Sequence, residues 1–311
     1  MRQALIIAGP TCSGKSALAL ALAERLGGTV INADAMQCYR ELRVLTARPT
    51  ADEEARVPHA LYGVLPAAVT GSVAWWRDAA LEAMAASPFP ILCGGTGMYL
   101  RALTQGLSAL PEVTPEARAE ARRLLAELGP AGLHARLHAE DAAVLRPSDS
   151  QRIARALEVF LATGRSLAAW QRAAPRLPPA PHAFRMVLLD PPRADLRAAI
   201  AARWAAMLAG GAREEVAALL AQGLDPGLPA MRAHGVPEIA ALLRGEVTEA
   251  EASRRAIANT AAYTRRQATW FRHQRVAAPQ AMHRINARIT SLAQFSESQR
   301  ADLISFLHGG G

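Results

Sequence analysis

The feature that most constrains the fold is an eight-residue phosphate-binding motif near the N-terminus. It matches the P-loop pattern G-x-x-x-x-G-K-[ST] and consists of Gly9, Pro10, Thr11, Cys12, Ser13, Gly14, Lys15 and Ser16. An apolar run at Leu5–Ala8 precedes the motif and a helical pattern at Ser16–Leu26 follows it. Backbone N–H groups of such a loop and the N-terminus of the next helix attract an anion. We therefore expect a bound di- or triphosphate, with Lys15 on the distal phosphate and the Ser16 hydroxyl on Mg²⁺.

The use of basic residues supports this assignment. Lysine and arginine total 35, and all of them except Lys15 are arginine. A compact ammonium group among phosphate oxygens cannot be replaced by a planar guanidinium, which explains why this position alone keeps lysine. The formal net charge of +8 predicts a polyanionic partner.

The cysteines and the hydropathy pattern indicate the compartment. Cys12, Cys38 and Cys93 are scattered singly, so the sequence predicts neither a zinc ribbon nor a disulfide framework. No apolar run reaches the ~18 residues of a membrane span, and no charged-then-apolar leader is visible. We expect a cytoplasmic monomer with no membrane partner.

The N-terminal third predicts a parallel sheet. A second apolar run, Thr29–Ala33, ends at Asp34, which gives the strand–loop–helix–strand order of a βαβ unit. A third strand, Phe89–Cys93, continues into the glycine-rich turn Gly94–Gly97. Ligands of parallel sheets gather at the carboxyl ends of the strands, so Asp34 is expected close to the bound phosphates.

The middle of the chain has a different texture. Residues 111–182 contain short helical patterns separated by proline and glycine, with no strand pattern. A strand pattern returns at Arg185–Asp190, and helices are expected at 193–209, 211–222 and about 249–272. The sequence therefore predicts an α/β protein: a P-loop NTPase/kinase-like core of residues 1–110 and 183–311, with an all-helical insertion at 111–182. We expect the last fifteen residues or so to fray.

Asp34 supports two hypotheses. It could cap a helix or act in the outer shell of Mg²⁺, or it could act as a general base beside a group held over the phosphates. Spacing alone does not choose between them. The third strand, by contrast, ends in Cys93 and glycines without the acidic residue that organises water and Mg²⁺ in P-loop hydrolases, which argues against hydrolysis.

Two helical segments carry basic faces. Between Ala252 and Ser296 there is no acidic residue, and an arginine stripe of Arg254, Arg255, Arg265, Arg266, Arg272, Arg275, Arg284 and Arg288 indicates contact with a phosphate backbone. On the predicted helix Gln151–Leu161, the side chains of Gln151, Arg152 and Arg155 share one arc. Taken alone, this second face is typical of an ordinary solvated helix.

The whole set of motifs resembles one family. The segments GPTCSGKS, DAMQCYR, LTARP, GGTGMYLRAL, SDSQRIARALEV, RWAAMLAGGAREEV, PAMRAHG and TAAYTRRQATWFR occur in this order between Leu5 and Arg272. Together they are similar to those of the bacterial tRNA dimethylallyltransferases, also called isopentenyl-tRNA transferases.

This resemblance implies the activity, the substrates and the roles of several residues. The family moves a dimethylallyl group from dimethylallyl diphosphate to the N6 amine of the adenosine just 3′ of the anticodon in tRNA. By likeness, the P-loop and Lys15 hold the donor diphosphate, Asp34 is the base, Thr96 lines the channel where the substrates meet, and Arg203 holds the diphosphate. Contacts to the anticodon stem-loop are implied for Asp34, Ala35, Met36, Gln37, Thr96, Arg118, Gln151, Arg152, Ile153, Ala154, Arg155, Arg232, Ala233, His234, Gly235 and Val236.

The chain also departs from the family pattern. Ala35 stands where serine commonly follows the base, Arg48 stands for the lysine of GTAKP, and Ala60 stands for the second histidine of PHH.

Two other functions compete with this one. A small-molecule kinase would use the same loop for ATP, but it would not need a long basic stripe free of acidic residues. An RNA-binding protein of the ATPase type is disfavoured by Asp34 beside the loop and by the missing acidic residue on the third strand.

Overall fold

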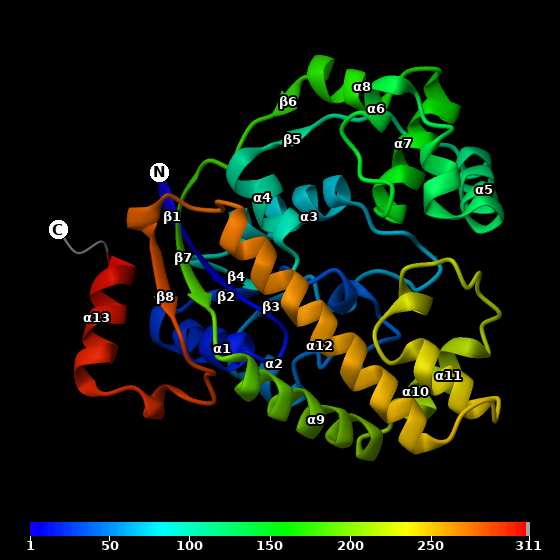
Figure 1. Cartoon of the computed structure of the whole chain (residues 1–311). Helices are drawn as coiled ribbons and strands as arrows, with labels where there is room; N and C mark the ends of the chain where they lie inside the picture. The colour runs from blue at the N-terminus through cyan, green and yellow to red at the C-terminus, as the bar shows by residue number, and fades with distance from the viewer. Residues whose placement is uncertain (309–311) are drawn as a thin grey trace. The chain divides into compact units, whose positions relative to one another are not determined.

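The computed structural model describes residues 1–308. They form two compact units (Figure 1). The core unit contains residues 1–105 and the chain from residue 179 onward, and the inserted unit contains residues 106–178.

The core unit is built on one six-stranded sheet with the strand order β3-β2-β4-β1-β7-β8. Every neighbouring pair is parallel, so all the carboxyl ends lie at one edge. The strands are β1 (Arg2–Ala8), β2 (Thr29–Asn32), β3 (His59–Ala60), β4 (Pro90–Gly94), β7 (His182–Leu189) and β8 (Met282–Ile285). The two-residue β3 and the four-residue β8 form the edges.

The buried parts of the central strands, such as Ala4–Ala8 of β1 and Met186–Leu189 of β7, are apolar at consecutive positions because both faces of the sheet are covered. On β1, Leu5 and Ile7 belong to one hydrophobic cluster, which includes side chains of α1 (Lys15–Leu26) and α13 (Glu297–His308). Ile6 belongs to the opposite cluster. That cluster draws on α3 (Val73–Ala86), α4 (Gly97–Gln105), α9 (Arg193–Ala209), α10 (Ala212–Leu220), α11 (Val236–Leu243) and α12 (Glu249–His273).

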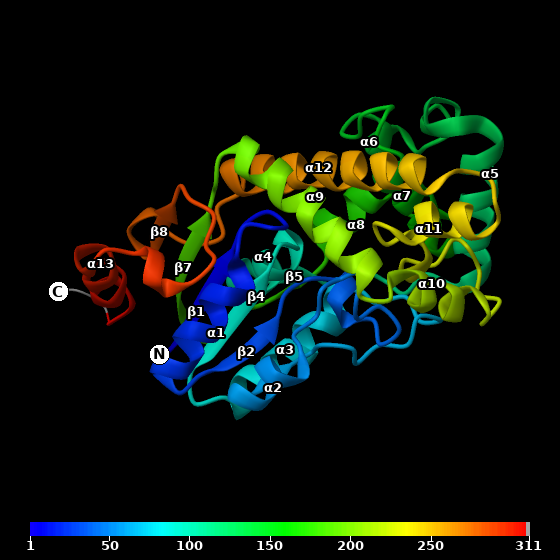
Figure 2. The ribbon, with the colours of Figure 1, turned by 90° about the horizontal axis from the view of Figure 1, so that it is seen from below.

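Helices α9 and α12 are packed against each other, as the two views agree (Figures 1 and 2). Trp204 of α9 fixes their register, since its indole Nε1 donates to Ser253 Oγ on α12 at 2.9 Å. Short helical turns complete the core unit: η1 (Met36–Cys38), α2 (Ala51–Arg56), η2 (Ala230–Arg232), η3 (Pro279–Ala281) and η4 (Leu292–Gln294).

The inserted unit consists mainly of helices. These are α5 (Pro115–His134), α6 (Ala139–Ala142), α7 (Ser150–Thr163) and α8 (Leu167–Ala173). Helix α5 is broken at Gly129, whose φ of 67° is left-handed, just before Pro130. The expectation of an all-helical insertion misses an antiparallel ribbon between β5 (Leu107–Ser108) and β6 (Arg176–Leu177). Two-residue strands are too short to leave an alternating pattern. The unit begins at residue 106 and ends at residue 178, whereas the sequence predicts 111 and 182.

The long periodic segments are confirmed, and the C-terminal segment is not. The predicted helix 193–209 is α9, and the predicted long helix is α12. Fraying was expected for the last fifteen residues, but Glu297–His308 form α13, in which Leu303 and Leu307 are buried. The remaining residues of that prediction, 309–311, lie outside the described part of the chain. Within residues 1–308, no helix has the length and apolar character needed to span a membrane.

Candidate active site

The P-loop joins β1 to α1 in a conformation that its glycines allow. Gly14 has a φ of 95°, and a Cβ atom at this position would lie 1.8 Å from the carbonyl oxygen of Ile289. Helix α1 begins at the next residue, so its positive N-terminus faces the loop. Lys15 folds back, and its Nζ donates to the Pro10 carbonyl at 2.8 Å. Burial lowers the pKa of Lys15, while the charge of Asp34 raises it.

Ser16 offers a hydroxyl suited to Mg²⁺. It is exposed in the first turn of α1, where a diphosphate on the loop would lie within reach of the same ion. Among residues 1–308, no group of three or more His, Cys, Asp or Glu side chains could hold a metal. A site of one hydroxyl plus phosphate and water oxygens is what Mg²⁺ commonly accepts. The Ser16 hydroxyl also contacts the Cys93 thiol, whose pKa burial raises to about 11.

Asp34 lies just beyond the end of β2 and is held by Asn32. The Asn32 side chain accepts from Asp34 N at 2.8 Å and donates to Asp34 O at 2.9 Å. One carboxylate oxygen of Asp34, Oδ1, accepts the Met36 N–H at 3.0 Å. This bond is a local turn contact just before η1, whose N-cap is Ala35 and which has no side-chain cap, so both hypotheses for Asp34 stay open. The negative charge of Asp34 also raises the pKa of Lys15, so the carboxylate lies near enough to the P-loop to act on this lysine.

Thr96 connects the glycine-rich turn to the segment that carries Asp34. Its N–H donates to Ala33 O at 3.1 Å, and its Oγ1 accepts the Ala35 N–H at 3.0 Å. Because the main chain of Ala35 makes this bond, the contact does not depend on the serine that the family commonly has here.

Arg203 lies on the other side of the P-loop. Its Nη2 donates to Thr46 O at 3.0 Å, and its Nη1 is 3.9 Å from Cys12 Sγ. The same guanidinium lowers the pKa of Lys15. Arg203 and Lys15 therefore both contact the P-loop, Arg203 near Cys12 and Lys15 at Pro10.

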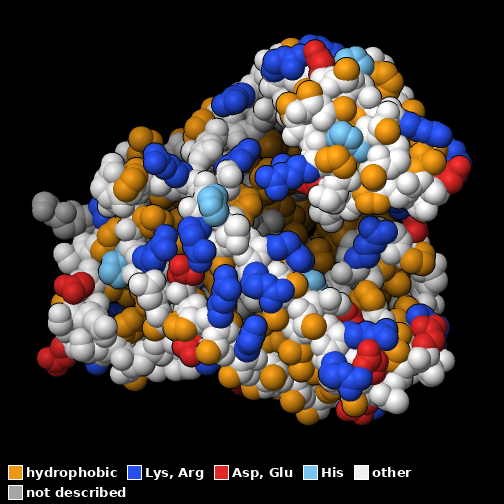
Figure 3. All heavy atoms as spheres, in the orientation of Figure 1, with side chains coloured by type: hydrophobic (Ala, Val, Ile, Leu, Met, Phe, Trp, Pro, Cys, Tyr) orange, Lys and Arg blue, Asp and Glu red, His pale blue; other side chains and the backbone are white. Residues whose placement is uncertain are grey.

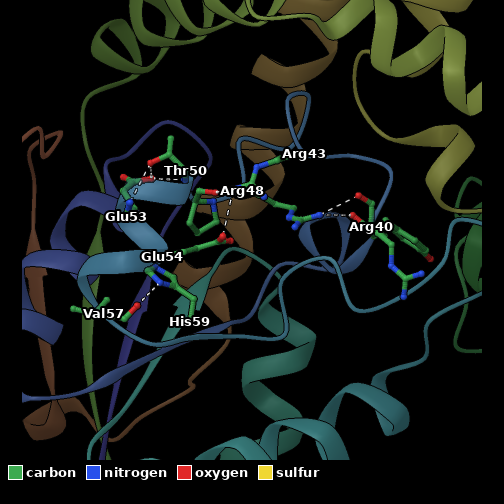
Figure 4. Close-up of polar contacts among 10 residues, drawn as sticks. Arg40, Arg43, Arg48, Thr50, Glu53, Glu54, Val57 and His59 are labelled. Carbon is green, nitrogen blue, oxygen red and sulfur yellow. Dashed lines mark hydrogen bonds and ion pairs between the residues drawn. The ribbon is translucent and has the colours of Figure 1, made fainter.

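Thr46 belongs to the segment of residues 39–59, which is held together by polar contacts among its own residues (Figure 4). Arg48 Nη1 donates to the carbonyl of Arg40 at 3.1 Å, and Arg43 pairs with Glu54 at 3.4 Å. Gln37 Nε2 donates to Thr46 O at 2.9 Å, the same carbonyl that Arg203 uses. Arg48, which replaces the family's lysine, thus has a structural role in holding this segment.

Two polar residues on α12 that bond to the segments around the P-loop were not predicted from the sequence. Gln267, which is 4% exposed, accepts the Thr11 N–H at 2.8 Å and donates to Gly95 O at 3.2 Å. The hydroxyl of Tyr263 lies within hydrogen-bonding reach of Gln267 and Thr96, and burial raises its pKa. The motif TAAYTRRQATW contains both residues, but a glutamine on a helix gives no sign that it bonds to two distant loops.

The turn at Arg232–Val236 is partly accessible. The side chain of Glu238 accepts the Gly235 N–H at 3.0 Å and is held in turn by Asn259 of α12 at 2.7 Å. Arg232 is exposed, and the ring of His234 lies 4.9 Å from that of Tyr263. The side chains of Ala233 and Val236 are buried in the core and Gly235 is buried as well, so Arg232 and His234 carry the accessible side chains of this turn, and its predicted contact with tRNA stays a prediction.

In the inserted unit, the predicted RNA-contacting positions differ in exposure. Arg118 on α5 is exposed, as are Gln151 and Arg152 on α7, and Ala154 and Arg155 are partly exposed. Ile153 is 0% exposed and packs in a hydrophobic cluster of this unit, so its side chain serves the core, and its predicted RNA contact stays a prediction. Helical periodicity turns it away from its neighbours Arg152 and Ala154.

The arginine stripe is only partly free to bind a ligand. Basic side chains gather where α12 crosses the face seen in Figure 3. Arg254 and Arg255 pair with Glu251, and Arg284 pairs with Asp190 at 3.2 Å. Arg265, Arg272 and Arg275 are exposed and form no ion pair within the described chain. This unpaired part of the stripe is the surface best suited to a phosphate backbone.

Sequence and structure comparisons give one consistent result. A family model described as IPP transferase matches residues 37–274, and one described as isopentenyl transferase matches residues 2–59. A tRNA dimethylallyltransferase of Acidiphilium cryptum is 59% identical over 99% of this chain and 95% of its own length. One of Gluconacetobacter diazotrophicus is 60% identical over 98% of this chain and 94% of its own.

Solved structures agree with this result. The tRNA isopentenylpyrophosphate transferase of Bacillus halodurans is 27% identical, with a TM-score of 0.67 over 99% of this chain and 98% of its own. A eukaryotic dimethylallyltransferase, solved in work on its action on tRNA, is 21% identical and shows the same fold, with a TM-score of 0.77 over 99% of this chain and 80% of its own. The chain belongs to the IPP transferase family, the tRNA dimethylallyltransferases.

Proposed function

We propose that this protein transfers a dimethylallyl group from dimethylallyl diphosphate to the N6 amine of the adenosine 3′-adjacent to the anticodon in tRNA, and releases diphosphate. The observation that carries this proposal is that Asp34, Thr96, Lys15 and Arg203 meet around the P-loop at the carboxyl edge of the sheet. Family membership supports the same reaction.

The diphosphate group of the donor is assigned to the P-loop. Its oxygens accept hydrogen bonds from the loop amides at the N-terminus of α1, and Lys15 and Arg203 bind them as positive charges. When the bond between the allylic carbon and the diphosphate oxygen breaks, negative charge grows on the leaving group, and these fixed positive groups stabilise it. Ser16 and the diphosphate oxygens would hold Mg²⁺, which supplies further charge stabilisation when it is bound.

We assign the acceptor amine to a position beside the Asp34 carboxylate. An aromatic amine is a weak nucleophile, so it attacks a carbon that already has cation character. As the nitrogen–carbon bond forms, the amine must lose a proton, and the Asp34 carboxylate accepts it. The contacts of Thr96 with Ala33 and Ala35 keep the carboxylate segment in place, and Tyr263 supports Thr96 from α12.

The tRNA is recognised through its phosphate backbone and one extruded base. The adenine must leave the stack to reach Asp34. Arg232, Arg265 and Arg272 of the core unit are exposed and suited to the anticodon stem-loop. Arg118, Gln151 and Arg152 of the inserted unit supply further contacts. The three free cysteines are all buried and none forms a disulfide, in agreement with action in the reducing cytoplasm, where the substrate tRNA is found.

The test is a conversion assay with purified protein, dimethylallyl diphosphate, Mg²⁺ and unmodified tRNA. We expect mass spectrometry of the nucleosides to show isopentenyladenosine, and a tRNA with guanosine at the target position to remain unmodified. Absence of the modified nucleoside, together with rapid ATP turnover on a small acceptor, would favour a kinase instead.

A further inference from the structure

Arg288 lies against the P-loop, although it is far from it in the sequence. Its Nε donates to the carbonyl oxygen of Cys12 at 3.1 Å. The next residue, Ile289, donates its N–H to Ser13 O at 2.9 Å, and its side chain is buried in the core. The side-chain amide of Gln294 donates to Arg288 O at 2.9 Å. The segment that carries Arg288 is therefore fixed on both sides.

The Arg288 guanidinium has free hydrogen-bonding capacity. Only its Nε is used within the described residues, so both Nη groups are available, and the residue is exposed. Because the bond from Nε to Cys12 fixes the plane of the guanidinium, the Nη donors are already oriented for a planar or tetrahedral anion.

Arg288 and Arg203 line the same open pocket, which has a volume of about 660 Å³. Ala198, Ala199 and Ala202 of α9 form its apolar wall, and Asp195 lies on its rim. The two arginines and one carboxylate leave a net positive charge. Both arginines also contact Cys12, Arg288 at its carbonyl oxygen and Arg203 near its sulfur. The pocket thus adjoins the outer flank of the P-loop.

We propose that Arg288 is a second arginine of the diphosphate site, and that with Arg203 it forms the pocket through which the diphosphate group enters and leaves. The inference rests on the proposed function, because it assigns the pocket to the donor and its product. Arg203 uses Nη2 to hold Thr46 O at 3.0 Å, whereas Arg288 keeps both Nη groups unengaged within the described residues. Arg288 is therefore assigned to binding and release of the diphosphate.

The test uses the full chain and inorganic diphosphate with Mg²⁺ as the probe, measured by calorimetry. A charge-assisted hydrogen bond is worth enough that Arg288→Ala should weaken diphosphate binding by about 10-fold. In turnover assays, the KM for dimethylallyl diphosphate should rise by a similar factor, while kcat changes less than about 3-fold. The KM for tRNA should not change.

Arg300→Ala is the matched control. Arg300 also donates from Nε to a main-chain oxygen, that of Phe295, at 3.0 Å, but it lies on α13 and does not line the pocket. The Arg300→Ala substitution removes the same charge and the same kind of bond, and it should leave diphosphate binding unchanged.

Arg288→Gln tests whether Arg288 binds the diphosphate group or only stabilises the P-loop through its bond to Cys12 O. Glutamine can still donate to Cys12 O but carries no charge, so it should bind diphosphate as weakly as the alanine variant, and Arg288→Lys should recover part of the affinity. Should Arg288→Ala fail to fold, these two variants still give the answer. Wild-type diphosphate affinity in Arg288→Gln would overturn the proposal. The two proposals can also fail separately. If Arg288→Ala lowers the affinity for diphosphate but the wild-type protein does not modify tRNA, the assignment of the pocket stands and the proposed function is rejected.

Discussion

The side chain of Gln267 accepts a hydrogen bond from the backbone N–H of Thr11, with 2.8 Å between Oε1 and N. Its Nε2 donates to Gly95 O, so one buried glutamine of α12 joins the P-loop to the glycine-rich turn that carries Thr96. Through Gln267, the P-loop and the turn before Thr96, which are the proposed sites of the donor diphosphate and the acceptor base, are joined directly.

Gln267→Leu should therefore damage both sites at once. The substitution leaves the Thr11 N–H and the Gly95 carbonyl without a partner in a buried place, each at a cost of about 1–3 kcal/mol. We expect a lower melting temperature and at least a ~10-fold loss of kcat/KM for the donor. Gln274→Leu, which removes a bond to Arg101 at the end of α12, is the control. Equal effects of the two substitutions would contradict a special role of Gln267.

The unpaired arginines of α12 predict how tRNA binding depends on salt. Each phosphate contact contributes about 0.9 to the slope of log K against log salt. Arg265→Gln combined with Arg272→Gln should weaken binding of unmodified tRNA and reduce the slope by about 1.5–2. The control is Arg213→Gln combined with Arg244→Gln, which removes the same charge from side chains that are already paired with Glu249 and Glu246. An unchanged slope in the α12 variant would place the RNA elsewhere.

His182 predicts a pH-dependent contribution to stability. Both ring nitrogens of this residue, at the start of β7, are buried and have no hydrogen-bond partner among residues 1–308, and desolvation followed by the charge of Arg2 lowers its pKa. The folded state therefore favours the neutral ring. Its contribution is fully present above the unfolded-state pKa, about 6.5, and is lost as the pH falls below that value, because the unfolded chain then binds more protons.

His182→Phe should remove this dependence. We expect the variant to lose less stability than the wild type between neutral pH and about pH 5, in a series of denaturant titrations. His273→Phe, on the exposed end of α12, serves as the comparison. A variant at position 182 with the same acid sensitivity as the wild type would show that the ring is solvated in solution.

How far the sequence predicts the fold depends on the length of each pattern. The P-loop follows from its motif and Asp34 from the end of the apolar run of β2, and the long helices α9 and α12 follow from local periodicity, because their hydrophobic faces repeat over several turns. Strand β8 and helix α13 were missed. The edge strand is half exposed and only four residues long, and α13 contributes few buried side chains.

The site was predictable where a motif marks it and not where distant segments meet. Gln267 is 256 residues from Thr11, and Arg288 is 276 residues from Cys12. Neither contact has a local signal, because each depends on how α12 and the C-terminal segment pack on the sheet. Ile153 shows how a resemblance and a structure differ in detail: the resemblance marks a continuous run of residues on α7, whereas the helix buries the Ile153 side chain within that run.

The central claim is that the Asp34 carboxylate accepts the proton of the adenine amine. The most direct test is the rate of isopentenyladenosine formation in a single turnover of Asp34→Asn, with the Kd for unmodified tRNA measured on the same preparation. Asparagine retains the Oδ1 acceptor for Met36 N but cannot take up the proton. We expect the rate to fall by about 10²–10⁴-fold, with the Kd unchanged. A wild-type rate, or a loss of tRNA affinity in proportion to the loss of rate, would contradict the account.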